Sequence, residues 1–309
     1  MNLRENLDMR FPPGSAAVAL GFFDGLHIGH MAVIRETVRQ AKENGKTPCV
    51  FTFTPGGVFP YPKGGQSLLG KRMSERILRE EGVRELIRPN FSEFGDLSPE
   101  AFVRDILAGK FGAAYAVCGE NYRFGKNAAG DAALLKKLCN GLIDLTVIPM
   151  QTKNAVTVSS GSIRALLREG EIEKAAELSG RPFSIDFTVC EGKKLGRKIG
   201  IPTINQPFPD DFVRPKFGVY ASISHVNGRQ YPSVTNIGVK PTVGSDTVLA
   251  ETYIHDFSGS LYGQNIQVDL ISFIRPERKF ASIAELKEQI LRDCSAAQLR
   301  RIEDLGFGF

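Results

Sequence analysis

The chain has 309 residues, of which 42% are hydrophobic, so it can bury a sizeable core and is expected to form two domains. Its net charge of +5 is modest, and Lys and Arg alternate with Asp and Glu, so no basic tract points to nucleic acid or a membrane surface. Five cysteines without a C-x-x-C pair, a start without a signal-peptide core and the lack of a membrane-length apolar run together favour a cytoplasmic protein with reduced thiols.

The first half alternates between strand and helix patterns. The predicted strands are 16–20, 47–53, 83–87, 114–118 and 142–149. The predicted helices are 31–44, 74–81, 98–110 and 131–140. Ser98, Pro99 and Glu100 are typical of a helix start, because they supply a cap, a proline at the first position and an acid in the first turn. This alternation predicts a doubly wound, mostly parallel sheet, which binds ligands at the carboxyl ends of its strands.

The second half is dominated by strand patterns. Two short helices, 162–169 and 172–178, precede the change of character near Arg181 and Pro182. The predicted strands that follow are 183–190, 219–226, 229–237, 248–257 and 266–274. Asn227 and Gly228 form a strong hairpin signal, and five short strands favour a small β-barrel. A terminal helix over 282–294, capped by Ser282, completes a domain of 183–309 after a first domain of 1–182.

Two histidines lie where the first strand passes into the first helix, in LGFFDGLHIGH at 20–30. Because His27 and His30 are three residues apart, both rings fall on one side of the helix start, where free N–H groups favour an anion. A packing role is one alternative. A zinc site is another alternative, but two histidines without further Cys or His nearby make a poor set of zinc ligands. We interpret the pair as neutralising a triphosphate while another phosphate attacks its α-phosphorus.

Three further segments have both a binding and a plain structural interpretation. Ser159 and Ser160 lead into a helix, and Arg164 one turn later can fork onto phosphate oxygens; the alternative is a capped surface helix. GENYRFG at 119–125 is either a ring-stacking site or a surface turn. EGKKLGRKIGIPTIN at 191–205 is basic and glycine-spaced, so it lets phosphate approach its backbone, or else it is an ordinary loop.

Residues 20–30 resemble the nucleotidyltransferase signature of the bacterial bifunctional riboflavin kinase/FAD synthetase family. Residues 119–125 and 158–164 are similar to its other nucleotide and flavin segments, and 202–205 resembles its Pro-Thr-Ala-Asn motif with Ile204 in place of alanine. Segments 236–242, 250–257 and 273–280 also resemble its kinase module. The resemblance implies a Rossmann-like adenylyltransferase that joins FMN to AMP, followed by a riboflavin kinase barrel. It further implies ATP, riboflavin, FMN and FAD as substrates and products, with Mg²⁺.

The resemblance also implies two sets of site residues. In the adenylyltransferase half, the catalytic residues are His27, His30 and Arg164, and the binding residues are Gly21, Phe23, Asp24, Gly25, Asn121, Arg123, Ser159 and Ser160. In the kinase half, Gly192, Gly196, Arg197, Gly200 and Arg275 bind nucleotide or flavin, Thr203 and Asn205 hold Mg²⁺ and phosphates, and Glu251 is the catalytic base. Thr203 and Asn205 offer the hard oxygen donors that magnesium prefers. A strand-edge acid facing water is the alternative for Glu251, and His255 is expected to be a surface or satisfied histidine.

The sequence departs from the family pattern in its first half. Residues 54–57 read TPGG where the family has Asp-Pro-His-Pro, and Gly161 follows Ser159 and Ser160 where the family has threonine. These changes motivate an alternative, a riboflavin kinase whose nucleotide-binding first domain is weak or inactive. A second alternative is a non-catalytic flavin-binding regulatory protein. Under all three hypotheses, the expected partners are small molecules, and neither nucleic acid nor a membrane is expected.

Overall fold

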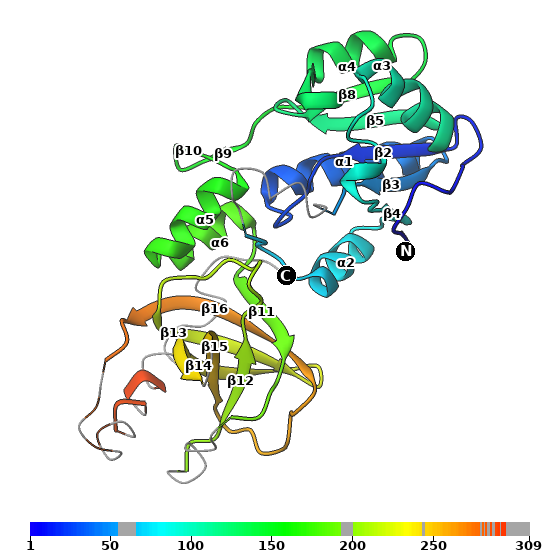
Figure 1. The fold of residues 1–309 in the computed structure, drawn as a ribbon. Coiled ribbons are helices and arrows are strands. Elements are labelled where there is room, and N and C mark those ends of the chain that lie inside the picture. The colour runs from blue at the N-terminus through cyan, green and yellow to red at the C-terminus, as the bar shows by residue number, and fades with distance from the viewer. Residues whose placement is uncertain are drawn as a thin grey trace. The chain divides into compact units, whose positions relative to one another are not determined.

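The computed structural model describes residues 1–54, 66–192, 200–242 and 245–278, and further positions at 280, 282, 285, 288–290 and 292–294. The chain divides into two compact units (Figure 1). Unit 1 comprises Met1–Gly65 and Lys71–Ser159, and unit 2 comprises Gln66–Gly70 and Ser160–Phe309.

Unit 1 is built on a six-stranded sheet in which every neighbouring pair is parallel. In sheet order the strands are β1 (Asn2–Arg4), β4 (Glu85–Ile87), β3 (Thr47–Phe51), β2 (Ala16–Leu20), β5 (Ala113–Gly119) and β8 (Asp144–Ile148). The chain runs outward from β2 to β4 and then returns to β5 on the other side of β2. The predicted parallel sheet is therefore confirmed, and its order reverses between β2 and β5, where such sheets bind ligands.

The helices of unit 1 are α1 (Ile28–Glu43), α2 (Lys71–Glu80), α3 (Pro99–Ala101), which continues as the π-helix η3 (Phe102–Lys110), and α4 (Ala132–Cys139). Its short elements are the hairpins β6 (Arg123–Phe124) with β7 (Gly130–Asp131) and β9 (Thr152–Lys153) with β10 (Val156–Thr157), and the 3₁₀ turns η2 (Phe91–Glu93) and η4 (Lys126–Ala128). Helix α1 contacts β2, β3 and β5. Ser98 caps α3 as predicted, because its hydroxyl accepts the N–H of Ala101 at 3.2 Å.

Unit 2 begins with α5 (Ser160–Glu169) and α6 (Ile172–Ser179) and continues into a six-stranded antiparallel sheet. In sheet order the strands are β11 (Phe183–Thr188), β16 (Asn265–Arg275), β13 (Gly218–Val226), β14 (Arg229–Thr242), β15 (Ser245–Ile254) and β12 (Thr203–Pro207). The sheet curls until its edges β11 and β12 meet: the N–H of Cys190 donates to the carbonyl of Asn205 at 2.8 Å, and Gln206 Nε2 donates to the carbonyl of Phe187 at 2.8 Å.

The hairpin signal is confirmed, and one strand was missed. Asn227 and Gly228 have φ of 50° and 77° between the paired residues Val226 and Arg229, as a two-residue hairpin requires. The prediction of five strands was wrong: the sheet has a sixth strand, β12, whose sequence is typical of a loop. Its Asn205, Gln206 and Pro207 have low strand propensity, and pairing with β15 makes it a strand.

The described residues near the end of the chain are helical at Glu285, 288–290 and 292–294, and Ser282 Oγ accepts the N–H of Glu285 at 3.1 Å. The rest of the predicted helix over 282–294 lies outside the described residues. Cys294 and Ile290 pack on a cluster formed by Val219, Ala221, Val234 and Ile271 on one face of the sheet.

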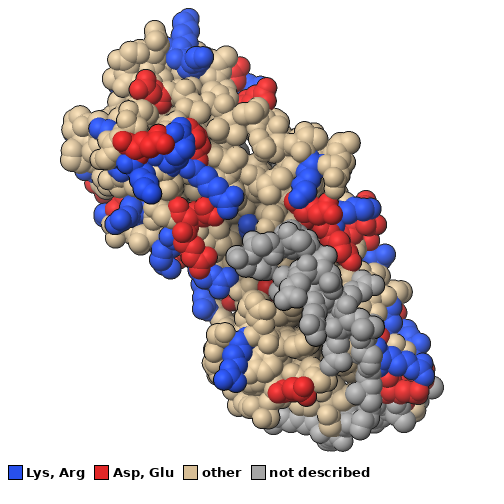
Figure 2. Space-filling model, turned by 180° about the vertical axis from the view of Figure 1, so that it is seen from behind, with Lys and Arg blue, Asp and Glu red and all other residues tan. Residues whose placement is uncertain are grey.

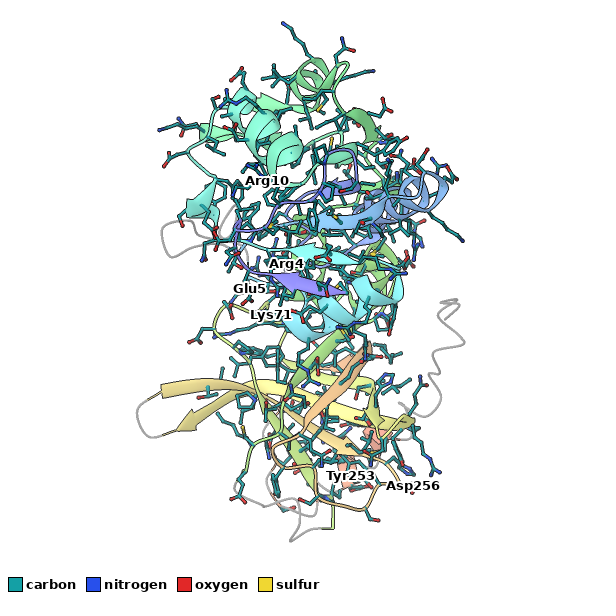
Figure 3. All side chains as sticks on the ribbon, turned by 90° about the vertical axis from the view of Figure 1, so that its right-hand side faces the viewer. Arg4, Glu5, Arg10, Lys71, Tyr253 and Asp256 are labelled. Atoms are coloured by element: carbon teal, nitrogen blue, oxygen red, sulfur yellow. The ribbon has the colours of Figure 1, made fainter. Side chains whose placement is uncertain are left out.

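Charged side chains of both signs are interspersed on the face of the molecule that Figure 2 shows. Several form ion pairs, such as Arg39 with Glu36 and Glu43 on α1, and Lys71 with Glu5 at 2.7 Å (Figure 3). In the part of the chain that the structure describes, no helix is both long and apolar enough to cross a membrane.

Candidate active sites

The two histidines of the turn after β2 are in direct contact. His27 caps α1, since its Nδ1 accepts the N–H of His30 at 3.2 Å. Their rings stack with centroids 3.6 Å apart and planes 20° apart, and His27 is only 6% exposed. The prediction that both rings share one side of the helix start is confirmed. The helix begins at Ile28 instead of beside His30, because the His27 side chain replaces the missing partner of a first-turn N–H.

The turn itself has an unusual backbone. Phe23 and Leu26 have φ of 49° and 43°, a region that residues with a side chain seldom adopt, and Gly25 has φ of 80°. A Cβ on Gly21 would lie 2.9 Å from the ring of Phe23, and this ring forms a T-shaped contact with the ring of His30 at a centroid distance of 5.3 Å. Asp24 is 9% exposed. Strained backbone of this kind persists where the surroundings enforce it, which is common at ligand sites.

The turn is supported from β3. Thr52 follows that strand, and its hydroxyl donates to the carbonyl of Phe22 at 2.7 Å. The ring of Phe22 lies 4.9 Å from that of Phe53. Of the family departures at 54–57, only Thr54 is described; its N–H donates to the carbonyl of Pro89 at 3.0 Å.

The segment after β5 lies at the same sheet edge, since β2 and β5 are parallel neighbours. Asn121 is exposed there, with its Oδ1 3.2 Å from the position of a Cβ on Gly119. The rings of Tyr122 and Phe124 stack at 5.8 Å. Arg123 is exposed and pairs with Asp131 at 4.0 Å. The structure thus brings the predicted His27, His30, Asn121 and Arg123 to one edge of one sheet.

The serine-containing segment 158–164 includes the boundary between unit 1 and unit 2. Ser159 is the last residue of unit 1, and Ser160 opens α5 of unit 2. Arg164 is buried in α5, where its Nε donates to the carbonyl of Gln66 at 2.7 Å. It is therefore not the solvated arginine of the surface-helix alternative.

The predicted kinase residues Thr203, Asn205 and Glu251 lie side by side on two neighbouring strands of unit 2, β12 and β15. Asn205 on β12 faces Glu251 on β15, and Glu251 faces Asn236 on β14. Directly opposed residues of an antiparallel pair point to the same face with Cβ atoms about 5 Å apart. Thr203 precedes Asn205 by two residues, so it shares that face and faces Tyr253. Sequence reasoning placed Thr203, Asn205 and Glu251 in one site, and the strand register brings them together.

The loop before β12 approaches this set through glycine. A Cβ on Gly192 would lie 2.5 Å from Nδ2 of Asn205, so only glycine lets the backbone come so close to that amide. Gly200 has φ of 77°. Gly196 and Arg197 lie outside the described residues.

Sequence reasoning assigned no role to three polar residues beside Glu251 and Gly238, namely Asn236, Lys240 and Glu277. Lys240 on β14 donates from Nζ to Oε1 of Glu251. Asn236 donates from Nδ2 to Oε1 of Glu277 at 3.2 Å, and a Cβ on Gly238 would collide with that carboxylate. The spacing of two among Asn236, Gly238 and Lys240 was the available signal, since it places them on one face of a strand.

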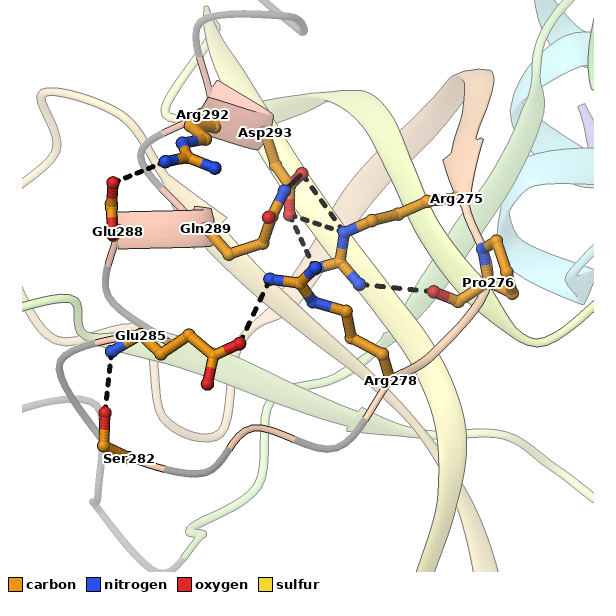
Figure 4. A network of polar contacts seen from close by, with 9 residues as sticks. All are labelled: Arg275, Pro276, Arg278, Ser282, Glu285, Glu288, Gln289, Arg292 and Asp293. Atoms are coloured by element: carbon orange, nitrogen blue, oxygen red, sulfur yellow. Dashed lines mark hydrogen bonds and ion pairs between the residues drawn. The ribbon is translucent and has the colours of Figure 1, made fainter.

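Arg275 is engaged within a polar network beside the terminal helical residues (Figure 4). Its Nε and one terminal nitrogen donate to the carboxylate of Asp293 at 3.2 and 2.7 Å, and Gln289 donates to the same group at 2.8 Å. Asp293 is only 3% exposed. Contact of Arg275 with flavin or nucleotide stays a prediction.

The predicted non-catalytic histidine lies at the end of β15. His255 Nδ1 pairs with the carboxylate of Asp256 at 3.0 Å, and Tyr253 and Asp256 mark this end of the strand in Figure 3. A second carboxylate pair, between Asp269 and His225 Nε2 at 2.7 Å, lies on β16 and β13.

Family models match both halves of the chain. The FAD synthetase model matches residues 12–162, and the riboflavin kinase model matches residues 179–300. A bifunctional riboflavin kinase/FMN adenylyltransferase from Listeria monocytogenes is 34% identical over 286 residues, which is 89% of each chain.

The chain belongs to the bifunctional riboflavin kinase/FAD synthetase family.

Other relatives agree with this assignment. The bifunctional riboflavin kinase/FMN adenylyltransferase of Escherichia coli K12 is 34% identical over 289 residues, or 91% of each chain. Among solved structures, a Streptococcus pneumoniae protein described as a macrolide-efflux protein shares the fold, with a TM-score of 0.85, 28% identity and coverage of 96% of this chain and 98% of that one. ATP and flavins are the substrates of this family, and the predicted membership is confirmed.

Proposed function

We propose that unit 2 phosphorylates riboflavin with ATP to give FMN, and that the parallel-sheet half adenylylates FMN with a second ATP to give FAD and pyrophosphate. The observation that carries the proposal is the strand register that sets Asn205 beside Glu251, together with the stacked His27 and His30 in the other half. Each half therefore holds its own polar set, as two separate reactions require.

In the kinase reaction, Glu251 accepts the proton of the riboflavin 5′-hydroxyl as that oxygen attacks the γ-phosphorus of ATP. The carboxylate is 23% exposed, so it is open to substrate while neighbouring strands hold it. Gly192 lets the backbone lie directly against Asn205, so the phosphates can bind beside that amide without a further side chain in the way. Catalysis then consists of positioning, proton removal and charge stabilisation.

The residues present fit a magnesium ion bound with the ATP phosphates. Thr203 and Asn205 carry neutral oxygen donors on one face of β12, and Glu251 lies opposite Asn205. Mg²⁺ binds a few protein oxygens and fills its remaining positions with phosphate and water. When bound here, the ion would neutralise phosphate charge, with the Thr203 hydroxyl and the Asn205 carbonyl oxygen as its protein ligands.

In the adenylyltransferase reaction, a phosphate oxygen of FMN attacks the α-phosphorus of ATP and pyrophosphate leaves. His27 and His30 lie at the N-terminus of α1, where imidazole N–H groups and the helix dipole offset the charge that builds up on the triphosphate. Glycines 21 and 25 allow the backbone to approach the nucleotide, and Phe23 and Asp24, in the turn between them, are the further binding residues.

The remaining predicted residues of the two activities are proposed on their chemistry. Asn121 and Arg123 are exposed at the same sheet edge and offer hydrogen bonds to nucleotide or flavin. Ser159, Ser160 and Arg164 supply hydroxyls and a guanidinium for phosphate oxygens, and Arg275 serves the flavin or nucleotide of the kinase. We further propose a doubly wound sheet in a first domain of 1–182, a terminal helix in a second domain of 183–309, and a cytoplasmic location.

The kinase-only and regulatory alternatives are less well supported. The FAD synthetase match over 12–162 and the bifunctional relatives favour two activities, despite Thr54 and Gly161. A binding protein without turnover has no need for Glu251 beside Thr203 and Asn205.

The kinase assignment is tested by E251Q, which keeps the shape of the side chain and removes its basicity. We expect FMN formation from riboflavin and ATP to fall at least about 100-fold, with flavin binding retained. The matched control is E80Q on the surface of α2, which should keep the wild-type rate. Full FMN formation by E251Q would exclude Glu251 as the base, and loss of activity in E80Q would expose a general defect.

A further inference from the structure

Lys240 is a cation of the kinase face to which neither the motifs nor the family resemblance gave a role. It lies on β14 at the same face as Asn236 and Gly238, and its Nζ donates to Oε1 of Glu251. The side chains of Lys240 and Glu251 are 41% and 23% exposed. An ion pair exposed to this extent adds at most about 1 kcal/mol to stability, so stabilisation alone is a weak reason for it.

The reaction geometry places the transferred phosphoryl group close to Lys240. The attacking hydroxyl lies within about 3 Å of the base that removes its proton, and about 3–3.5 Å from the phosphorus. A lysine that already contacts the base is therefore within reach of the phosphoryl oxygens, since its four-carbon stem is flexible and its ammonium has three donors. Lys240 holds Oε1 of Glu251, and Oε2 can receive the hydroxyl proton.

Two other cations of the described part of unit 2 are held elsewhere. Arg275 is bound to the buried carboxylate of Asp293. Arg278 pairs with Glu285 at 3.6 Å and lies over the ring of Phe280. Glu277, which Asn236 contacts, adds negative charge to the same face and increases the need for a cation where phosphate arrives.

We propose that Lys240 is a further catalytic residue of the kinase reaction, with Glu251 as its partner before ATP binds and the γ-phosphoryl group as its partner during transfer. This inference rests on the proposed role of Glu251. As the ribityl O–H bond breaks, its proton passes to Glu251 and the oxygen forms a bond to the γ-phosphorus. The bond from that phosphorus to the β,γ-bridging oxygen breaks, and its electron pair leaves with ADP. Lys240 offsets the charge on the transferred group and releases the carboxylate for the proton.

The test compares K240M, K240R and the control R229M in the full chain. Arg229 is an exposed cation at the hairpin end of the same strand. FMN formation is measured at varied riboflavin and ATP, which gives kcat and KM. We expect kcat of K240M to fall about 100-fold with little change in KM for riboflavin, K240R to recover most of the rate, and R229M to match the wild type.

Inhibition of FMN formation shows where Lys240 acts. ADP lacks the γ-phosphate that the β,γ-imido analogue of ATP carries. In K240M the inhibition constant of the analogue should rise about 10-fold and that of ADP should stay constant. Equal rises for both inhibitors, or wild-type kcat in K240M, would overturn the inference. An active E251Q would instead remove the base assignment on its own, so the two failures are distinguishable.

Discussion

His27 accepts the backbone N–H of His30 through Nδ1 while the two imidazole rings stack 3.6 Å apart. One side chain therefore starts helix α1 and also lies against the second histidine, so folding of the helix and assembly of the site are the same local event. The turn also contains a left-handed Phe23, whose ring forms a T-shaped contact with the ring of His30.

Replacing the second histidine should separate the two activities. H30A leaves the kinase half untouched, so FMN formation should stay at the wild-type rate. FAD formation from FMN should fall about 100-fold or more, because a donor to the triphosphate is lost. Both products are measured by chromatography, with H255A as a control that keeps FAD formation. A parallel loss of FMN formation in H30A would contradict separate sites.

Two substitutions at His27 distinguish capping from catalysis. Asparagine is a good N-cap and alanine is a poor one, so H27A should lower the free energy of unfolding by about 1 kcal/mol while H27N leaves it near the wild-type value. Both should lose FAD formation, because neither carries an imidazole. Urea titration and the FAD assay check the pair. A fully active H27N would show that the ring serves only the helix.

Breaking the ion pair of Arg275 with Asp293 should strongly lower the stability of unit 2. D293N leaves a partly buried guanidinium without its charge partner, which costs about 3–5 kcal/mol of unfolding free energy. R292A removes an exposed pair with Glu288 and should change the same quantity by less than about 0.5 kcal/mol. Equal effects in denaturant titrations would contradict the importance of burial.

The thiols should differ sharply in reactivity. Burial raises the pKa of Cys49 and Cys118 to about 12, and that of Cys139 and Cys294 to about 11. The thiolate is the reactive form, so these four should be inert at pH 8. Cys190 is exposed, and its backbone pairs with Asn205.

A thiol reagent should therefore label one cysteine in the native protein and all five after unfolding. Labelling of Cys190 should reduce FMN formation, since it crowds the loop beside Asn205, and MgATP should slow it. C190S should stay active in the presence of the reagent. Rapid native labelling of Cys49, or activity loss in treated C190S, would contradict this arrangement.

Much of the first half was predictable because its signals are local. The apolar run at 16–20, the glycine turn and the helical spacing after His30 lie next to one another in the chain, and the parallel sheet follows from the alternation of strand and helix. The left-handed φ of Phe23 and Leu26 was not predictable, because non-glycine residues adopt it only when their surroundings enforce it.

The second half depends on contacts between distant residues. β12 became visible only through its pairing with β15, and the contact of Lys240 with Glu251 depends on the register of β14 against β15. The pair of Arg275 and Asp293 likewise joins the end of β16 to the terminal helical residues. Motif resemblance named Thr203, Asn205 and Glu251, but it carried no information on the neighbours that hold them.

The central claim is that one chain carries both activities. The adenylyltransferase half departs more from the family pattern, at Thr54 and Gly161. The most direct test is to incubate the purified protein with FMN, ATP and Mg²⁺ and to follow FAD by chromatography. The account predicts a FAD peak that grows with time, pyrophosphate in equal amount, and loss of both in H30A. FMN that remains unchanged in the wild-type protein would contradict it and leave a riboflavin kinase alone.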